Sequence, residues 1–297
     1  MKIFRETIDL NRYFSSENTS ARRITFYAES AFYYRYFSGY IDYILKNSPY
    51  DLCYITSEAS DPIFKNDNKR IKKFYAASFF PYIAKHTDAR ALVYTMDDLH
   101  QFAVKRSSNK NVEHIYAMHA MNSTTMSHRD GAFDYYDSVF CVGPYQKEEI
   151  LLREQKYSLS HKKLVEVGYP YLDDIMKQKI INHPTNSNTV LVAPSWHEGN
   201  IFETCIIPLV QSLLMSGFKV IARPHDEMLK QRPELVSSIS KRFENEKLFV
   251  FETNLGNVES VQSASLLIAD WGGIVFEWAF TKECPVMLIN TNMKIQN

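Results

Sequence analysis

Residues 268–280 read IADWGGIVFEWAF, and this stretch shows how the chain is built. A short apolar run ends at Asp270, the pair Gly272-Gly273 follows, and a second apolar run begins that holds one acid, Glu277. A short apolar run bounded by turn residues predicts a buried strand, whereas the longer run after the glycines predicts a helix. The stretch therefore predicts one strand–turn–helix unit of an α/β protein.

The second half of the chain repeats this alternation. Apolar runs predict strands over 189–195, 219–225, 247–253, 266–270 and 285–290, with helical patterns over 201–216, 232–243, 257–264 and 273–280 between them. Five strands that alternate with helices are typical of a Rossmann-like domain with a parallel sheet.

The first half shows the same alternation less regularly. Strands are predicted over 23–28, 52–57, 91–96, 112–118, 138–143 and 164–170, with helices over 30–45 and 145–156. The aromatic segment 31–45 fits a helix packed into the core better than a membrane-facing surface. The polar segment 177–189, KQKIINHPTNSNT, reads as a linker. We therefore predict two Rossmann-like domains, 1–184 and 185–297.

Composition and charge exclude several classes of protein. The 34 basic and 34 acidic side chains balance, which argues against a nucleic-acid-binding protein. The N-terminal sequence MKIFRETIDLNRYF mixes charged and apolar residues and is not a signal peptide, and no apolar run is long enough to span a membrane. The four cysteines lie far apart in or next to apolar runs, so we expect buried thiols in a reducing cytoplasm rather than disulfides or a zinc site. No cluster of acids points to any other metal site.

Polar residues at strand ends are the candidates for function, because open α/β sheets bind ligands at the carboxyl ends of their strands. In the second half, Gly272 and Gly273 would let a phosphate or diphosphate approach the N-terminus of the following helix. Asp270 precedes them, and Glu277 could accept hydrogen bonds from ribose hydroxyls. The alternative is that Asp270 caps the helix and Glu277 is a surface acid.

Two further strand ends of the second half carry polar groups. RPH, at 223–225, offers the planar fork of Arg223 to a phosphate and a hydrogen-bond donor from His225. APSWHEG, at 193–199, places Ser195 beside a helix start, while its histidine and glutamate are expected to face solvent. The alternative for RPH is a strand end with a solvated Arg223 and a turn-forming proline.

In the first half, the loop MHAMNSTTMSHRDGAFDYYD at 118–137 follows a strand. His119 lies just past the strand end and could act as a general base on an acceptor hydroxyl. A single histidine is more often structural, but a second histidine, an arginine and several hydroxyl groups lie in the same loop and favour a functional role. The acceptor-side candidates in this loop are Ser123, Thr124, His128 and Arg129.

The order of these segments resembles that of a known family. GYP-x-x-D at 168–173 is followed by L-x-APSW at 191–196, RPH at 223–225, a block at 263–277 that ends in DW-x-G-I-x-FE, and PV-x-x-IN at 285–290. This series is similar to the CDP-glycerol glycerophosphotransferase family, which includes teichoic-acid and capsule polymer transferases. The resemblance covers about residues 112–297 and implies a GT-B fold, in which two Rossmann-like domains face a cleft.

The resemblance also implies roles for individual residues. His119 matches the family's first-domain histidine, the candidate base, and His225 matches the histidine that stabilises the donor's phosphates. Asp270 to Gly273 matches an aspartate followed by two small residues at the donor phosphates. The family continues beyond its PV-x-x-IN strand, so the resemblance implies that the present sequence is truncated.

The expected function is that of a cytoplasmic transferase, with association at the inner face of the plasma membrane left open. It would move a glycerol-phosphate, polyol-phosphate or sugar group from a nucleotide-activated donor, with a CDP or CMP donor favoured, to a hydroxyl of a cell-surface polymer or its lipid-linked primer. No cofactor or metal is expected. Two alternatives remain: a nucleotide-sugar 2-epimerase, with Asp130, Asp134 and Glu198 as candidate acids, and a non-catalytic scaffold in capsule assembly.

Overall fold

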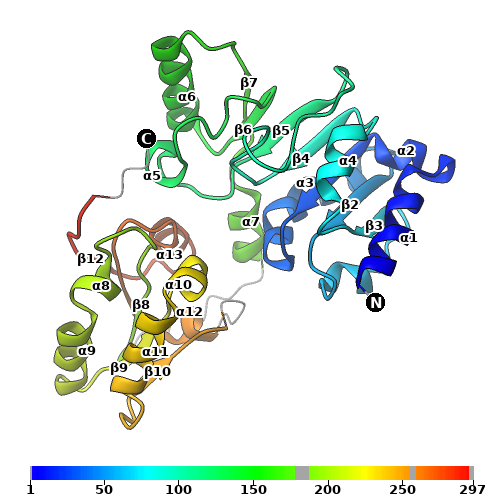
Figure 1. Cartoon of the computed structure of the whole chain (residues 1–297). Coiled ribbons are helices and arrows are strands. Elements are labelled where there is room, and N and C mark those ends of the chain that lie inside the picture. Colours follow the sequence, from blue (N-terminus) through cyan, green and yellow to red (C-terminus); the bar gives the residue numbers. More distant parts are fainter. Residues whose placement is uncertain (1, 178–186, 255–258, 294–297) are drawn as a thin grey trace. The chain divides into compact units, whose positions relative to one another are not determined.

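The computed structural model describes residues 2–177, 187–254 and 259–293. The chain divides into two compact units, one ending at Tyr171 and the other beginning at Leu172. The domain boundary predicted at 184/185 lies outside the described residues. Each unit is built around one parallel sheet (Figure 1).

The first unit contains a seven-stranded sheet in the order β3-β2-β1-β4-β5-β6-β7, and every neighbouring pair is parallel. Its strands are β1 (Ile24–Ala28), β2 (Leu52–Thr56), β3 (Ile71–Tyr75), β4 (Ala91–Tyr94), β5 (Glu113–Ala117), β6 (Ser138–Cys141) and β7 (Lys163–Glu166). Its helices are α1 (Lys2–Phe14), α2 (Thr19–Arg22), α3 (Tyr34–Asn47), α4 (Phe80–His86), α5 (Thr124–Ser127), α6 (Pro144–Tyr157) and the start of α7 (Pro170–Lys177). Three short 3₁₀ helices complete it: η1 (Ser16–Asn18), η2 (Ala31–Tyr33) and η3 (Pro62–Lys65).

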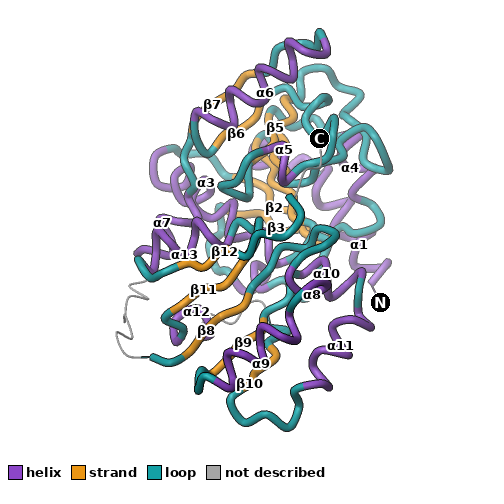
Figure 2. The backbone as a smooth tube through the Cα atoms, turned by 90° about the vertical axis from the view of Figure 1, so that its left-hand side faces the viewer, coloured by secondary structure: helices purple, strands orange, loops and turns teal. Residues whose placement is uncertain are grey.

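The second unit contains a five-stranded parallel sheet in the order β10-β9-β8-β11-β12, with the strands side by side in Figure 2. Its strands are β8 (Thr189–Val192), β9 (Lys219–Ala222), β10 (Phe249–Phe251), β11 (Leu266–Ala269) and β12 (Val286–Leu288). Its helices are α8 (Ile201–Thr204), α9 (Ile206–Met215), α10 (Asp226–Gln231), α11 (Pro233–Arg242), α12 (Glu259–Ser263) and α13 (Ile274–Lys282). The five predicted strands are confirmed.

The inner strands of each sheet are buried on both faces, which explains why they read as nearly continuous apolar runs. Along β8, Val190 and Val192 pack with residues of α8 to α11, whereas Leu191 packs on the opposite face with residues of α12 and α13, among them Trp278. In the first unit, one face packs against α1, α4 and α6 and the other against α3. The aromatic segment 31–45 is a core helix as predicted, since Tyr36, Phe37 and Ile41 are buried.

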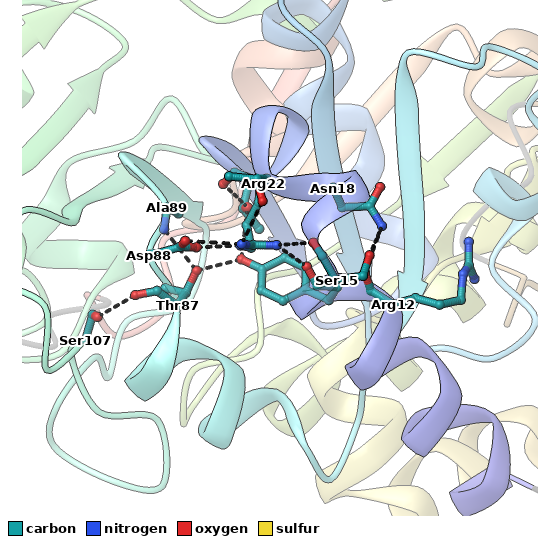
Figure 3. A network of polar contacts seen from close by, with 11 residues as sticks. Arg12, Ser15, Asn18, Arg22, Thr87, Asp88, Ala89 and Ser107 are labelled. Carbon is teal, nitrogen blue, oxygen red and sulfur yellow. Dashed lines mark hydrogen bonds and ion pairs between the residues drawn. The ribbon is translucent and has the colours of Figure 1, made fainter.

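Polar contacts tie together the amino ends of the central strands of the first unit. The buried Arg22 guanidinium binds the Asp88 carboxylate and donates to the backbone carbonyls of Tyr13, at 2.5 Å, and Ser15, at 3.1 Å (Figure 3). The Tyr13 hydroxyl lies 2.7 Å from the Thr87 hydroxyl. This network holds α1 and α2 against the segment that leads into β4, at the edge of the sheet opposite the carboxyl ends.

Candidate functional site

The carboxyl ends of β8 and β11 form the centre of the candidate site in the second unit. The chain passes from β8 to β9 on one side, and β11 pairs with β8 on the other side. The order of the strands therefore reverses between β8 and β11, and this switch point is where open α/β sheets bind ligands. The predicted segments 193–199 and 270–273 both begin here.

Asp270 connects the two loops at this switch point. The residue is 4% exposed, and its two carboxylate oxygens accept hydrogen bonds from the backbone N–H groups of Ser195, at 2.6 Å, and Ile201, at 3.2 Å. Asp270 does not cap α13, because the N-cap residue of that helix is Gly273 and no side chain caps it. The capping alternative is therefore wrong, and Asp270 instead fixes the loop that follows β8.

The two glycines lie where that loop and α13 meet. A Cβ atom on Gly272 would lie 3.7 Å from the Ser195 nitrogen, an ordinary contact, and Gly273 has a φ of −63°. Neither glycine therefore needs the left-handed backbone that favours glycine. The first amides of a helix have no partner within the helix, so the N–H groups at the start of α13 are suited to an anion.

Arg223 and His225 follow β9 on the neighbouring side of β8. The Arg223 side chain is 12% exposed and lies 3.5 Å from the buried Glu252 carboxylate, which follows β10. Sequence reasoning missed Glu252, although its position directly after a strand was a signal for a candidate site residue. The Glu252 carboxylate thus forms an ion pair with the guanidinium at the strand ends.

His225 is an exposed residue that caps α10. Its Nδ1 accepts a hydrogen bond of 3.2 Å from the backbone N–H of Glu227, so Nδ1 carries no proton. A neutral imidazole has one proton, which must then lie on Nε2. His225 therefore presents an N–H donor at its outer nitrogen, with the Trp196 ring 6.4 Å away between centroids.

The other predicted residues of the second unit have mixed outcomes. Glu277 is partly buried and lies in the first turn of α13. That its carboxylate binds the ribose hydroxyls stays a prediction. Glu198 is exposed as expected. His197 is buried, with its Nε2 3.4 Å from the Thr291 hydroxyl, so the expectation that it faces solvent is wrong. The Ser195 hydroxyl belongs to a residue that is 1% exposed.

A second group of polar side chains lies at the carboxyl edge of the first sheet. His119 follows β5, and its Nδ1 is 3.1 Å from the hydroxyl of Tyr116 in the same strand. That hydroxyl donates to Asp97, which follows β4, at 2.9 Å. The predicted residue His128 is buried, and its Nδ1 is 2.9 Å from the same Asp97 oxygen. Sequence reasoning missed Asp97 and Tyr116, although the acidic pair after the predicted strand 91–96 was a signal.

The remaining residues of this loop are engaged by their own unit. Ser123 is the N-cap residue of α5, and the Thr124 amide and hydroxyl donate to the Glu149 carboxylate at 2.7 and 2.6 Å. Arg129 pairs with Asp98. The structure thus gives Thr124 and Arg129 partners that hold the loop, and their role toward an acceptor stays a prediction.

Within the described ranges, no group of three or more His, Cys, Asp or Glu side chains is arranged to hold a metal ion. In the same parts of the chain, none of the helices has the length and apolar character needed to span a bilayer. The four cysteines are free thiols, of which Cys53 and Cys141 are buried and Cys205 and Cys284 partly buried.

Two parallel α/β units in one chain, each with a switch point at its strand ends, define the GT-B class of fold. Solved structures share it. A variant of the wall teichoic acid polymerase TagF soaked with CDPG matches 97% of this chain and 75% of that one, with a TM-score of 0.55 and 14% identity. The UDP-GlcNAc 2-epimerase of Methanocaldococcus jannaschii, in complex with UDP-GlcNAc and UDP, matches 91% of this chain and 85% of that one, with a TM-score of 0.67 and 14% identity.

A third similar structure is the UDP-GlcNAc 2-epimerase of Neisseria meningitidis bound to UDP-GlcNAc, with a TM-score of 0.60 and 13% identity over 91% of this chain and 83% of that one. No model of a protein family matches the chain, and no curated protein matches it. At these identities, the likeness establishes the fold.

Proposed function

We propose that this protein is a GT-B transferase that uses a nucleotide-activated donor, of the CDP or CMP type, and an acceptor hydroxyl. The transferred group is a glycerol-phosphate, polyol-phosphate or sugar, and the acceptor is a cell-surface polymer or its lipid-linked primer. The single observation that carries the proposal is Asp270, because its buried carboxylate fixes the loop after β8 beside the glycine-opened start of α13. This is the position at which the fold class binds nucleotides.

The donor's phosphate groups would bind at the start of α13 through the backbone amides of Gly272 and Gly273. Arg223 and the Nε2–H group of His225 would compensate the negative charge that develops on the leaving nucleotide. The backbone amide of Ser195 already binds Asp270, so Ser195 would reach a phosphate only through its hydroxyl. These groups take the place of a metal ion, and the reaction needs no cofactor.

On the acceptor side, His119 would remove the proton of the attacking hydroxyl. The oxygen keeps the electron pair of the broken O–H bond and forms the new bond to the donor, while the bond to the leaving nucleotide breaks. Glu277 would hold the ribose of that nucleotide. The proposed setting is the cytoplasm, with the acceptor presented at the inner face of the membrane.

Two of the three candidate acids of the epimerase alternative form ion pairs within the first unit. Asp130 and Asp134 both bind Arg153, which lies on α6. A carboxylate that is held by an arginine of its own unit is less available to remove a proton from a substrate carbon. Glu198 is exposed on the loop after β8.

A thermal-shift panel with CDP, CMP, UDP, GDP and ADP tests the proposal. A ligand at one hundred times its dissociation constant stabilises the folded state by about 2.7 kcal/mol, which raises the melting temperature measurably. We expect a shift selective for the cytidine nucleotides that is lost in Glu277→Gln and kept in Glu244→Gln, a control at an exposed acid of the same unit.

Other results would redirect the proposal. A shift selective for UDP would favour a sugar transferase or the epimerase, and release of free nucleotide only in the presence of an acceptor would separate these two. The absence of a shift with every nucleotide would contradict the proposal and favour a scaffold.

A further inference from the structure

Four polar side chains at the carboxyl edge of the first sheet form a chain of hydrogen bonds. Asp97 accepts from the Tyr116 hydroxyl and from His128 Nδ1, both at 2.9 Å, and the Tyr116 oxygen lies 3.1 Å from His119 Nδ1. Tyr116 is completely buried and His128 is 2% exposed, whereas His119 is only partly buried. These hydrogen bonds therefore connect the partly buried Asp97, through the buried Tyr116, to His119 at the strand ends.

The number of available protons decides which group donates and which accepts in each of these hydrogen bonds. The ionised Asp97 carboxylate can only accept hydrogen bonds, and Tyr116 has a single hydroxyl proton. A hydrogen bond to a carboxylate is stronger than one to a neutral nitrogen, so the Tyr116 proton points at Asp97. The Tyr116 oxygen then has only lone pairs to offer His119, and His119 Nδ1 must be the donor.

The electrostatic surroundings agree with these protonation states. Burial raises the pKa of Asp97, but His128, His119 and the hydrogen bonds from His128 and Tyr116 outweigh burial and hold that pKa below its usual value. Burial raises the pKa of the Tyr116 hydroxyl well above its usual value, so the hydroxyl stays protonated. Asp97 is thus an ionised acceptor and Tyr116 a neutral donor.

We infer that Asp97 and Tyr116 are positioning residues that hold the neutral His119 ring in its Nδ1–H tautomer and so place its lone pair on Nε2. The catalytic use of that lone pair rests on the proposed function, whereas the tautomer does not. When the acceptor's O–H bond breaks, its proton would bind Nε2 and its oxygen would keep the electron pair. The resulting imidazolium would keep its Nδ1–H bond to Tyr116, which is polarised by the Asp97 charge.

Packing around His119 fixes the ring as well as its proton. The Tyr36 and Tyr33 rings lie 5.7 and 6.0 Å from the His119 ring between centroids, and the Tyr169 hydroxyl donates to the His119 backbone carbonyl at 3.1 Å. Because aromatic rings limit its rotation, His119 cannot easily turn to exchange its two nitrogens. The hydrogen bond from Nδ1 then decides which nitrogen can act as the base.

The tautomer can be read without any substrate. We expect ¹⁵N NMR of the full chain, at a pH where His119 is neutral, to show protonated Nδ1 and unprotonated Nε2, with the His119 signal assigned from its loss in His119→Gln. Tyr116→Phe should abolish this preference, and Asp97→Asn should weaken it. Tyr136→Phe is the matched control, because it removes another buried tyrosine hydroxyl, which donates to the Met96 carbonyl, from a ring 5.3 Å from Tyr116.

Kinetics separates the inference from the proposed function. Tyr116→Phe should lower kcat at least about tenfold with KM little changed, because a ring with its proton on the wrong nitrogen cannot act as the base. Protonated Nε2 in the wild-type protein would overturn the inference, whatever the activity. The expected tautomer together with full activity of His119→Gln would instead refute the catalytic role of His119 and leave the positioning by Tyr116 intact.

Discussion

Replacing Asp270 tests the central connection of the second unit. The Asp270 carboxylate accepts from two backbone amides, at 2.6 and 3.2 Å, in a site that is 4% exposed. A hydrogen bond to a charged group contributes about 1.5–3 kcal/mol, and an unpaired buried donor costs about 1–3 kcal/mol. Asp270→Asn keeps one acceptor oxygen, so it should lower the free energy of unfolding by about 2 kcal/mol. Asp270→Ala leaves both backbone amides without an acceptor. It should lower the free energy of unfolding by about 4 kcal/mol, which is roughly a thousandfold change in the folding equilibrium.

The assay follows from where the tryptophans lie. Trp196, Trp271 and Trp278 are the three tryptophans of the chain, and all lie in the second unit. Tryptophan fluorescence during urea unfolding therefore reports on that unit alone. Glu198→Gln, at an exposed acid of the same loop, is the matched control and should unfold like the wild type.

One result would refute this reasoning. If the Asp270 carboxylate faced the donor's phosphates instead of the loop, Asp270→Asn would remove a repulsive charge. The variant would then bind nucleotide more tightly and unfold within about 0.5 kcal/mol of the wild type, as surface substitutions do.

Three further predictions concern other sites. In His225→Asn, a side-chain oxygen still caps α10 but the Nε2–H donor is lost. Turnover should therefore fall at least about tenfold, which corresponds to 1.4 kcal/mol of barrier, with the melting temperature unchanged. Wild-type turnover would remove His225 from the mechanism. His114 is 1% exposed, and burial is the main cause that lowers its pKa from 6.5 to about 4. The unfolded chain therefore binds this proton first, and stability should fall by about 3 kcal/mol between pH 6.5 and pH 4, a slope that urea unfolding of His114→Gln should lack. In Gly39→Ala the new Cβ would lie 2.4 Å from Pro170 Cβ. Alanine favours helices over glycine by about 1 kcal/mol, but the clash should outweigh this gain, so circular dichroism should show a lower melting temperature. An unchanged or higher melting temperature would contradict the clash.

The sequence predicts most strands because the inner strands of both sheets are buried on both faces, so each of them is a short apolar run. Strand β3 was missed because Lys72 and Lys73 lie in its middle, and such charges are tolerated since β3 is an edge strand. Helix α1 was also missed. Two of its three buried residues are acids, Glu6 and Asp9, and Asp9 accepts from the Tyr75 backbone amide at 3.0 Å. Acids on the buried side interrupt the apolar period that marks a helix.

The predicted helix over 201–216 is in fact two helices, α8 and α9, which meet at Cys205. Its apolar pattern continues through the break, so periodicity alone could not reveal it. The actual backbone at Cys205, with φ −144° and ψ 7°, is not helical. Helix α10, which follows the RPH segment, was not predicted because it is only six residues long.

The candidate site was predictable where one residue follows one strand. His119, His225 and Asp270 each lie just past an apolar run, and parallel strands bring such positions to one edge of each sheet. Asp97 and Glu252 are equally close to strand ends, but their importance comes from partners that lie far away along the chain. Such pairings depend on strand order, which the apolar pattern does not contain.

The pairing of β8 with β11 has a consequence for how the second unit assembles. Val190 pairs with Leu266, and Ser195 binds Asp270 across 75 positions of sequence. A growing chain that has reached β10 can pair β8, β9 and β10, yet one edge of β8 stays open and the loop after it has no anchor. Contacts so distant in sequence form late and slowly. The edge of the sheet that holds Asp270 and the proposed donor site would thus be the last part of the unit to form, and until then the unpaired edge of β8 is a place where another chain could pair by mistake.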